Sequence, residues 1–374
     1  PTRKAREAKR MEGIAKASKA IQEYQPQHDA ERKRLEAERE AKIALSKKAV
    51  ADYEDLLPEK AKEFATRMKG KTGTSWHLLR PGSVSTSDKS KVEILGDGSI
   101  RGTGGERPLD YRVSVGTKLT NITGMMVEVI PDLAFNGGPG LSKDGNMVIT
   151  EIETKWQGVE EGAKEMPITF VDAKASFTQK DFDVKRTFDG NLDGGNRGWA
   201  LGGGDYKVPH RAVYKVKDVI AGDPEKGVNL SVGILCRFKS HPLGRFRIYI
   251  TSDPDPLQFG LPSHVVEAVE KDDANRNQSD RDSLRDWVAE GDADYQSKLW
   301  AAKGPFPAIN PDKKMGELKK ALEYAQIPIE EDPRLVRFRR DVEMSAGQAE
   351  NPRLTAAQDL TWALINNPAF LFNH

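Results

Sequence analysis

The 374-residue sequence has almost no cysteine, no long hydrophobic run and no excess of charge of either sign. Its one cysteine, Cys236, excludes a disulfide within the chain and any site built from several thiolates. Cys236 lies in an apolar run, which predicts a small buried side chain. No stretch has the length of a membrane helix. The formal net charge of +1 gives no general reason to expect nucleic acid as a partner.

The chain also lacks a methionine or a signal peptide at its start, because it begins at Pro1. We therefore expect a processed product or the ordered part of a longer protein. The basic run 3–10 contains no aromatic residue, so it gives little support for nucleic-acid binding.

Residues 1–71 predict a charged helical hairpin or coiled-coil arm. From Ile14 to Tyr24 the apolar residues follow helical spacing and form a narrow stripe. Pro26 is expected to end this helix, and Asp29 is a candidate N-cap for a second one. A narrow apolar stripe on a highly charged helix is typical of an arm that lies along a partner surface.

The sequence of residues 72–258 predicts one all-β domain. Asp97-Gly98 lies between two short alternating segments and predicts a β-hairpin. Many short strands separated by Gly-, Asp- and Asn-rich turns predict an antiparallel β-sandwich of jelly-roll type. The strands are expected at 91–95, 110–115, 125–130, 147–152, 168–176, 210–216, 229–238 and 245–251.

In residues 259–374 the apolar residues again follow helical spacing, which predicts short helices joined by proline-containing turns. The last seven residues are apolar and aromatic, so Phe370, Leu371 and Phe372 are expected to dock on the chain itself or on a neighbouring subunit. The fold class is thus α+β and multidomain, with a central antiparallel β-sandwich between helical regions. The C-terminal helices are expected at 261–269, 280–289, 314–325 and 355–365.

Three Gly-rich loops, 135–146, 188–199 and 201–206, are where binding residues are expected, because loops on a rigid sheet commonly carry function. The loop 189–194 has oxygen-bearing side chains at alternate positions, as at the start of a Ca²⁺ loop. It lacks the closing glutamate of an EF-hand. Asp189, Asn191 and Asp193 remain candidate Ca²⁺ ligands, and a turn bonded to its own backbone is the favoured alternative.

A glycan site needs an aromatic face for the sugar ring and polar side chains for its hydroxyls. The candidate residues flank the glycines 202–204 or lie on neighbouring strands. For Trp199 the alternative is a core tryptophan, and for His210 it is a surface or cap position. The candidate glycan-binding set is Trp199, Tyr206, His210 and Arg245.

No catalytic signature accompanies these loops. Glu151 and Glu153 alternate on a strand, which predicts that both face solvent, and a glycosidase pair normally comes from different elements. There is no Gly-x-Ser-x-Gly elbow. The Gly-rich loop 136–142 lacks Gly-Lys-Ser/Thr, so we do not expect it to bind nucleotide phosphates.

Several strings match a known pattern, among them Trp76 to Pro81, Leu119 to Gly124, Gly198-Trp-Ala200 and the last 22 residues. With these the chain resembles the C-terminal part of planctomycete-specific multidomain surface proteins, which combine a cytochrome c-like module with planctomycete-specific domains. The resemblance covers most of the chain from about Lys47 onward. It implies an exported protein, periplasmic or at the cell surface, with a galactose-binding-like β-sandwich. No Cys-x-x-Cys-His is present, so no c-type haem is attached to this chain.

Two functions are expected from different classes. In the first, the chain is non-catalytic, its β-sandwich binds a glycan or a protein partner, and its helices assemble with other subunits or with further copies of the chain. In the second, the chain is a subunit or processed fragment of a larger polysaccharide-acting or redox enzyme. A cofactor is certain in neither, and Ca²⁺ is the one candidate.

Overall fold

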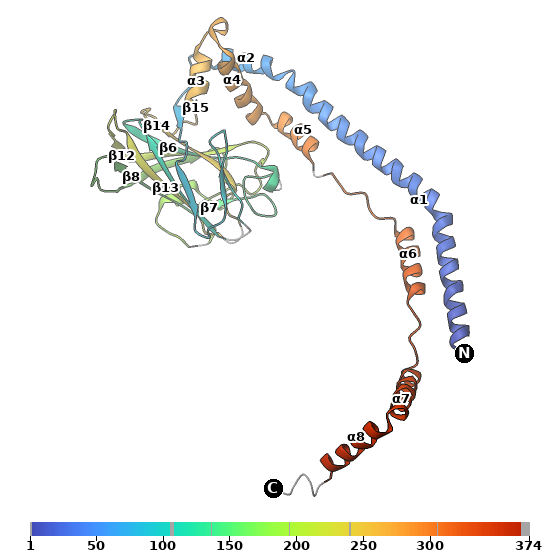
Figure 1. Cartoon of the computed structure of the whole chain (residues 1–374). Coiled ribbons are helices and arrows are strands. Elements are labelled where there is room, and N and C mark those ends of the chain that lie inside the picture. Colours follow the sequence, from blue (N-terminus) through green and yellow to red (C-terminus); the bar gives the residue numbers. More distant parts are fainter. Residues whose placement is uncertain are drawn as a thin grey trace. The chain divides into compact units, whose positions relative to one another are not determined.

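The computed structural model of the chain describes residues 2–104, 108–135, 137–193, 195–238, 241–304 and 306–367. Contacts divide the chain into two units, residues 40–306 and a second unit made of residues 1–39 with 307–374. Helix α1 spans Arg3–Glu54. Figure 1 shows the strands gathered in one β region of the first unit, with α2, α3 and α4 at one end of it.

Two larger sheets and one small sheet make up the β region. Every strand pair is antiparallel except β1 with β15. The eight-stranded sheet has the order β10(Phe170–Ala175)–β12(His210–Ile220)–β6(Ile122–Val129)–β14(Arg245–Thr251)–β1(Ser75–Leu78)–β15(Leu261–Pro262), with β4(Ile100–Gly102) on β14 and β3(Val92–Ile94) on β4. The five-stranded sheet has the order β2(Ser83–Thr86)–β5(Leu109–Thr117)–β13(Val228–Cys236)–β8(Glu151–Gly158)–β9(Met166–Ile168), and β11(Trp199–Ala200) pairs β7(Val148–Ile149).

The two larger sheets share one hydrophobic core. In β5, buried and exposed positions alternate, so Tyr111 and Val113 face inward, as expected for a strand with one solvated face. Val127 on β6 and Phe246 on β14 meet them from the larger sheet. Cys236 belongs to this core, as predicted, and burial raises the pKa of its thiol to about 12.

The larger sheet is also covered on its outer face. Because side chains alternate along β6, Val127 faces the core while Met126 points to the other side. There Met126 packs with Trp76, Val213 and Tyr249 in a second buried cluster. Polar side chains on this outer face are therefore held away from bulk water.

Three helices of the same unit pack together through small and aliphatic side chains. Helix α2 (Leu57–Met68) contributes Ala61 and Ala65, which lie one helical turn apart. Val265 from α3 (Ser263–Glu270) and Leu284 from α4 (Gln278–Gly291) complete the cluster. A reciprocal cap between Asn277 and Asp280 fixes the start of α4, with the two bonds each 2.9 Å. Helix α5 (Ala293–Lys303) follows.

The other unit contains the first part of α1, together with α6 (Lys313–Gln326), α7 (Pro333–Glu350) and α8 (Pro352–Ile365). The prediction that Pro26 ends a helix is wrong, because α1 continues through it. Tyr24 and His28, on either side of Pro26, both contact Asp312, at 2.8 and 3.1 Å. These contacts help to offset the cost of about 3 kcal/mol for proline within a helix.

The predicted mixed α+β class, with antiparallel sheets and helices at both ends, is confirmed. The predicted hairpin is also confirmed, since Ile94 pairs with Ile100 and Gly98 has a positive φ of 77°. Helices α5 and α7 were not predicted. The boundaries 1–71, 72–258 and 259–374 remain predictions, and Phe370, Leu371 and Phe372 lie outside the described residues. No described helix is both long and apolar enough to cross a membrane.

Candidate functional site

A buried glutamate occupies the centre of the larger sheet's outer face. The strand register places Glu128 of β6 opposite Arg211 of β12 on one side and Arg247 of β14 on the other. Arg211 Nε donates to Glu128 Oε1 at 2.8 Å, and Arg247 Nη1 donates to Oε2 at 3.0 Å. Tyr249 Oη also donates to Oε2, at 3.1 Å. With 0% of its surface exposed, Glu128 depends on these donors to remain charged.

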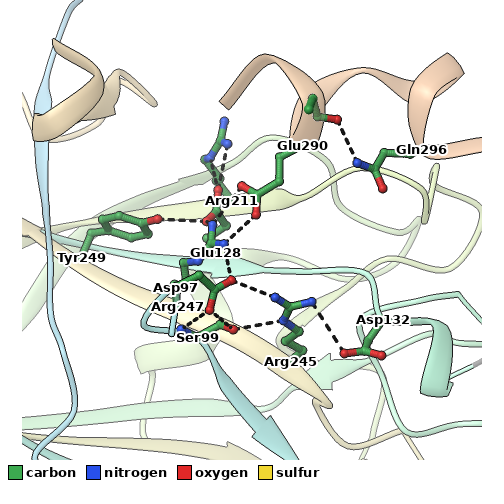
Figure 2. A network of polar contacts seen from close by, with 11 residues as sticks. Asp97, Ser99, Glu128, Asp132, Arg211, Arg245, Arg247, Tyr249, Glu290 and Gln296 are labelled. Carbon is green, nitrogen blue, oxygen red and sulfur yellow. Dashed lines mark hydrogen bonds and ion pairs between the residues drawn. The ribbon is translucent and has the colours of Figure 1, made fainter. Parts of the chain in front are cut away.

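The network continues toward the hairpin turn between β3 and β4. Asp97 Oδ2 accepts from Arg247 Nη2 at 2.6 Å and from Arg245 Nη2 at 2.8 Å. Arg245 Nε donates to Ser99 Oγ at 3.0 Å, and its Nη1 lies 3.6 Å from Asp132 Oδ2. Figure 2 shows Arg245 and Arg247 of β14, together with Ser99 of the turn, around Asp97.

Arg247 also joins the sheet to helix α4. Its two terminal nitrogens pair with both oxygens of Glu290, at 3.0 and 2.6 Å, in the bidentate geometry that arginine favours with carboxylates. The Arg211 guanidinium lies 4.4 Å from the centre of the Trp287 ring, a cation–π contact from the same helix. The outer face of the sheet and α4 are thus fixed to each other by paired charges (Figure 2).

A cleft of about 820 Å³ opens beside this network, between the sheet and the helices. Its volume is within the range of about 300–1,000 Å³ that is usual for small-ligand sites. Trp287 supplies aromatic surface, while Tyr249, only 2% exposed, and Arg247 form part of the cleft's floor. The lining residues come from β1 and the segment after it, the turn before β4, β14, the start of α3 and one face of α4.

Ion pairs and hydrogen bonds within the network determine which of its acidic side chains are ionised. Burial alone would raise the pKa of Glu128, but Arg211 and Arg247 outweigh it, so this pKa lies below the usual value. Burial likewise opposes ionisation of Asp97, yet Arg247 and Ser99 hold its pKa far below its usual range. Burial and the charge of Glu128 raise the pKa of Tyr249 well above its usual value, so its hydroxyl remains a donor.

The structure does not assemble the four predicted glycan-binding residues into one site. The side chain of Trp199 is 0% exposed and its Nε1 donates to the Phe177 carbonyl at 2.8 Å, so the core alternative holds and it presents no face to a sugar. His210 contacts the Asp205 carbonyl at 2.7 Å, and Tyr206 is half-buried against the core. Arg245 belongs to the Asp97 network instead. A glycan role for Tyr206, His210 and Arg245 remains a prediction.

The candidate Ca²⁺ loop is bonded to its own backbone, as in the favoured alternative. Asp189 Oδ1 accepts from the Asn191 N–H at 3.0 Å, and Asn191 Oδ1 accepts from the Asp193 N–H at 2.9 Å. Asp189 is also paired with Arg197. In the part of the chain that the structure describes, no group of three or more His, Cys, Asp or Glu is arranged to hold a metal. Gly194 lies outside that part, and calcium at this loop remains a prediction.

The prediction that Glu151 faces solvent is wrong. The loop that follows Phe188 covers it, so only 5% of its surface is exposed. Its Oε1 accepts from the Gly190 N–H at 3.1 Å, while the buried Oε2 has no partner among the described residues. Burial raises the pKa of Glu151 to about 7, and nearby Asp189 adds to the increase. Glu153, two positions on, is more exposed and pairs with Arg112 at 2.9 Å.

Sequence reasoning missed most of the cleft. One signal could have found the network beside it. Arg245, Arg247 and Tyr249 alternate with apolar residues on one strand, and Glu128 interrupts another apolar run. Charged residues on one face of two such strands predict that the face is buried and paired. The helix residues Trp287 and Glu290 carry no comparable signal, because only the tertiary structure brings α4 to the sheet.

No protein-family model matches this sequence, and a comparison with curated proteins also finds no match.

Proposed function

We propose that the chain is a non-catalytic binding module of an exported protein, periplasmic or at the cell surface, which takes a glycan in the cleft between the larger sheet and α4. In this proposal it is related to the planctomycete-specific surface proteins that its sequence resembles. The observation that carries the proposal is the cleft itself, with a floor fixed by the Glu128–Arg247–Glu290 network. A preorganised site loses little entropy when ligand binds.

The chemistry of the lining suits a sugar. Trp287 offers aromatic surface, whose negative ring face attracts the polarised C–H groups of a pyranose. Serine, histidine and arginine side chains supply donors and acceptors for hydroxyl groups.

The pairing of the carboxylates favours binding over hydrolysis. Asp97 and Glu290 accept from Arg247, and the Arg247 charge keeps Asp97 ionised. Asp282 and Asp286 both pair with Arg285. A glycosidase needs one carboxyl that is protonated near neutral pH, and the lowered pKa of Asp97 opposes that state for this carboxyl.

The finer fold assignment belongs to this proposal as well. In chain order, β5, β6 and β8 alternate between the two larger sheets, with β7 of the small sheet between β6 and β8, and β12, β13 and β14 alternate again. This alternation supports a jelly-roll sandwich of the galactose-binding-like kind.

A second candidate, a subunit of a larger polysaccharide-acting or redox enzyme, is favoured by exposed apolar side chains on α7 and α8. Phe338 is 64% exposed and Trp362 is 70% exposed. Large apolar side chains gathered on a surface commonly mark a contact with another protein. Co-purification of the native protein with a longer or haem-bearing chain would support this candidate, whereas a stable monomer alone would contradict it.

The test of the glycan function is a glycan-array screen followed by titration of the best hit, with wild type, Trp287→Ala and Trp362→Ala. Trp362 is a matched control, because it is an exposed tryptophan that does not line the cleft. We expect Trp287→Ala to weaken binding by about tenfold or more, or about 1.4 kcal/mol. Trp362→Ala should bind like wild type. Undiminished binding by folded Trp287→Ala would contradict the site.

A further inference from the structure

Helix α7 exposes apolar side chains along its length. None of its residues is buried. Leu335, Phe338 and Val342 are each more than half exposed to solvent. Most of the stability of helices in proteins comes from packing of an apolar face against another element, and α7 gains no such packing as a single copy. We therefore expect another helix or surface to cover this face.

The apolar side chains of α7 form one stripe. Leu335, Phe338 and Val342 are separated by three and then four residues, so they lie on one face of the helix. Ser345 and Ala349 continue the same spacing with small side chains, which allow a second helix to approach closely. A narrow stripe with this spacing is typical of the seam between two paired helices.

The charges of α7 divide the helix into two halves. Residues 333–340 contain four arginines and no acid, whereas residues 341–350 contain three acids and no base. The helix dipole favours the reverse order, with acids near the N-terminus and bases near the C-terminus. The observed order therefore does not stabilise α7 by itself. The charged residues are Arg334, Arg337, Arg339, Arg340, Asp341, Glu343 and Glu350.

Ion pairs within the same unit involve only the basic half of α7. Arg339 lies 3.3 Å from Glu331, and Arg334 lies 3.9 Å from Asp332. Both pairs are largely exposed, and such pairs contribute little to stability. The three acids of the second half form no ion pair with any described residue. Basic groups from outside α7 would complement them.

A second copy of α7 supplies those groups if the two helices run antiparallel. The basic half of each helix then lies against the acidic half of the other, whereas parallel pairing would place arginines against arginines. At about 100° per residue, Arg339 flanks the stripe on the same side as Glu343 and Glu350, and Arg334 does so with Asp341. A two-fold axis across the stripe brings like flanks together, so the surface is complementary to itself.

We infer that α7 is a self-association surface, on which α7 of a second copy of this chain packs antiparallel. The apolar stripe forms the seam, and the arginines of one copy face the acids of the other. This inference goes beyond the proposed function and does not depend on it, because no residue of α7 lines the cleft.

Sedimentation equilibrium of the full chain tests the pairing with wild type, Phe338→Gln and Met344→Gln. Met344 is the matched control, because it is an exposed apolar residue of α7 that lies off the stripe. We expect wild type to form a dimer of twice the 41.5 kDa chain, and to do so weakly, since one helix pair buries little area. Phe338→Gln should raise the dissociation constant about tenfold or more, because each dimer loses two buried rings. Met344→Gln should leave it unchanged.

Charge reversal separates loss of pairing from loss of the helix. Arg334→Glu combined with Arg339→Glu makes both flanks of the stripe acidic, and Glu343→Lys combined with Glu350→Lys makes one flank basic. Each variant alone should dimerise more weakly than wild type, and an equal mixture of the two should regain dimers. A mixture that stays as weak as either variant would overturn the charge complementarity.

Disulfide trapping tests the antiparallel orientation. The one native thiol, Cys236, is buried, so an introduced cysteine is the reactive one. Leu335→Cys and Ala349→Cys lie near opposite ends of the stripe. On oxidation we expect the mixed variants to cross-link with each other and neither to cross-link efficiently with itself. Efficient cross-linking of Leu335→Cys chains with each other would show parallel pairing and overturn the inference.

The remaining outcomes identify other occupants of the stripe. A wild-type chain that stays monomeric at every concentration would overturn the inference, and protection of Leu335→Cys from a thiol reagent would then show that the chain itself covers the stripe. Equal weakening by Phe338→Gln and Met344→Gln would also overturn it. Loss of glycan binding with the dimer intact would contradict the proposed function and leave the self-association standing.

Discussion

Two buried glutamates in the same unit, Glu128 and Glu151, differ in charge because they differ in partners. Glu128 lies between two arginines and a tyrosine hydroxyl, and its pKa is lowered. Glu151 receives one backbone N–H, has an unpartnered oxygen, and has its pKa raised to about 7. Burial is nearly equal at the two sites, so it does not determine protonation by itself. The paired glutamate supports Arg247 in the floor of the cleft, and the unpaired one lies beneath a loop.

The largest expected effect comes from breaking the paired network. Arg247→Met removes a donor from Glu128 and disconnects Glu290 from the sheet. Removing one partner of a buried ion pair costs about 3–5 kcal/mol, because the other charge stays buried. Denaturant unfolding at pH 7 measures the loss. Arg112→Met, which breaks the exposed pair with Glu153, should cost about 0–1 kcal/mol. Equal losses of unfolding free energy in the two variants would mean that a buried ion pair stabilises this protein no more than an exposed one.

The second expected effect is a gain in stability to unfolding, and its size depends on pH. The pKa of Glu151 is raised by folding, so its favourable contribution is complete below about pH 4.5 and is lost as the pH rises toward 7. Glu151→Gln keeps an acceptor for the Gly190 N–H and carries no charge. It should therefore stabilise the protein by about 1–3 kcal/mol at pH 8 and have little effect at pH 4.

The matched control for this prediction is Glu153→Gln, on the same strand but more exposed. Denaturant unfolding of wild type and both variants at pH 4 and pH 8 gives the comparison. A stability gain that is the same at both pH values would show that the charge of Glu151 is not its cause.

The smallest expected effect sharpens the account of Glu151 by asking whether a cation, rather than a proton, neutralises it. Arg197 already pairs with Asp189 in the adjoining loop, so we expect chelation of calcium to change the melting temperature by less than about 1 °C. A ligand that binds only the native state stabilises it, so a decrease of several degrees that added Ca²⁺ reverses would instead support the metal predicted at Asp189, Asn191 and Asp193.

Local patterns in the sequence predicted the secondary structure well where the period was regular. The alternation in 110–115 predicted a strand that lies within β5, and the Asp97-Gly98 turn predicted the hairpin of β3 and β4. Pro26 was misread because the contacts of Tyr24 and His28 with Asp312 come from a helix almost 300 residues further on. Proline's local preference can be overridden only by such distant contacts, and no local pattern reports them.

The candidate site was less predictable, because it too depends on contacts between residues far apart in the sequence. Trp199 was placed in a binding loop because glycines surround it, yet it fills the core and its Nε1 bonds a carbonyl. Glu151 was assigned to solvent by the alternation of its strand, but a loop from residue 188 onward covers that position. The network beside the cleft requires strand register, which pairs Glu128 with Arg211 and Arg247. Register depends on the whole sheet, so single-strand patterns do not contain it.

The central claim is that the cleft beside the Glu128 network is the ligand site, and a crystal structure of the chain soaked with the oligosaccharide that binds best on the glycan array tests it most directly. The account predicts a sugar ring against Trp287 in the cleft. A sugar bound instead at Tyr206 and His210, with the cleft empty, would contradict it.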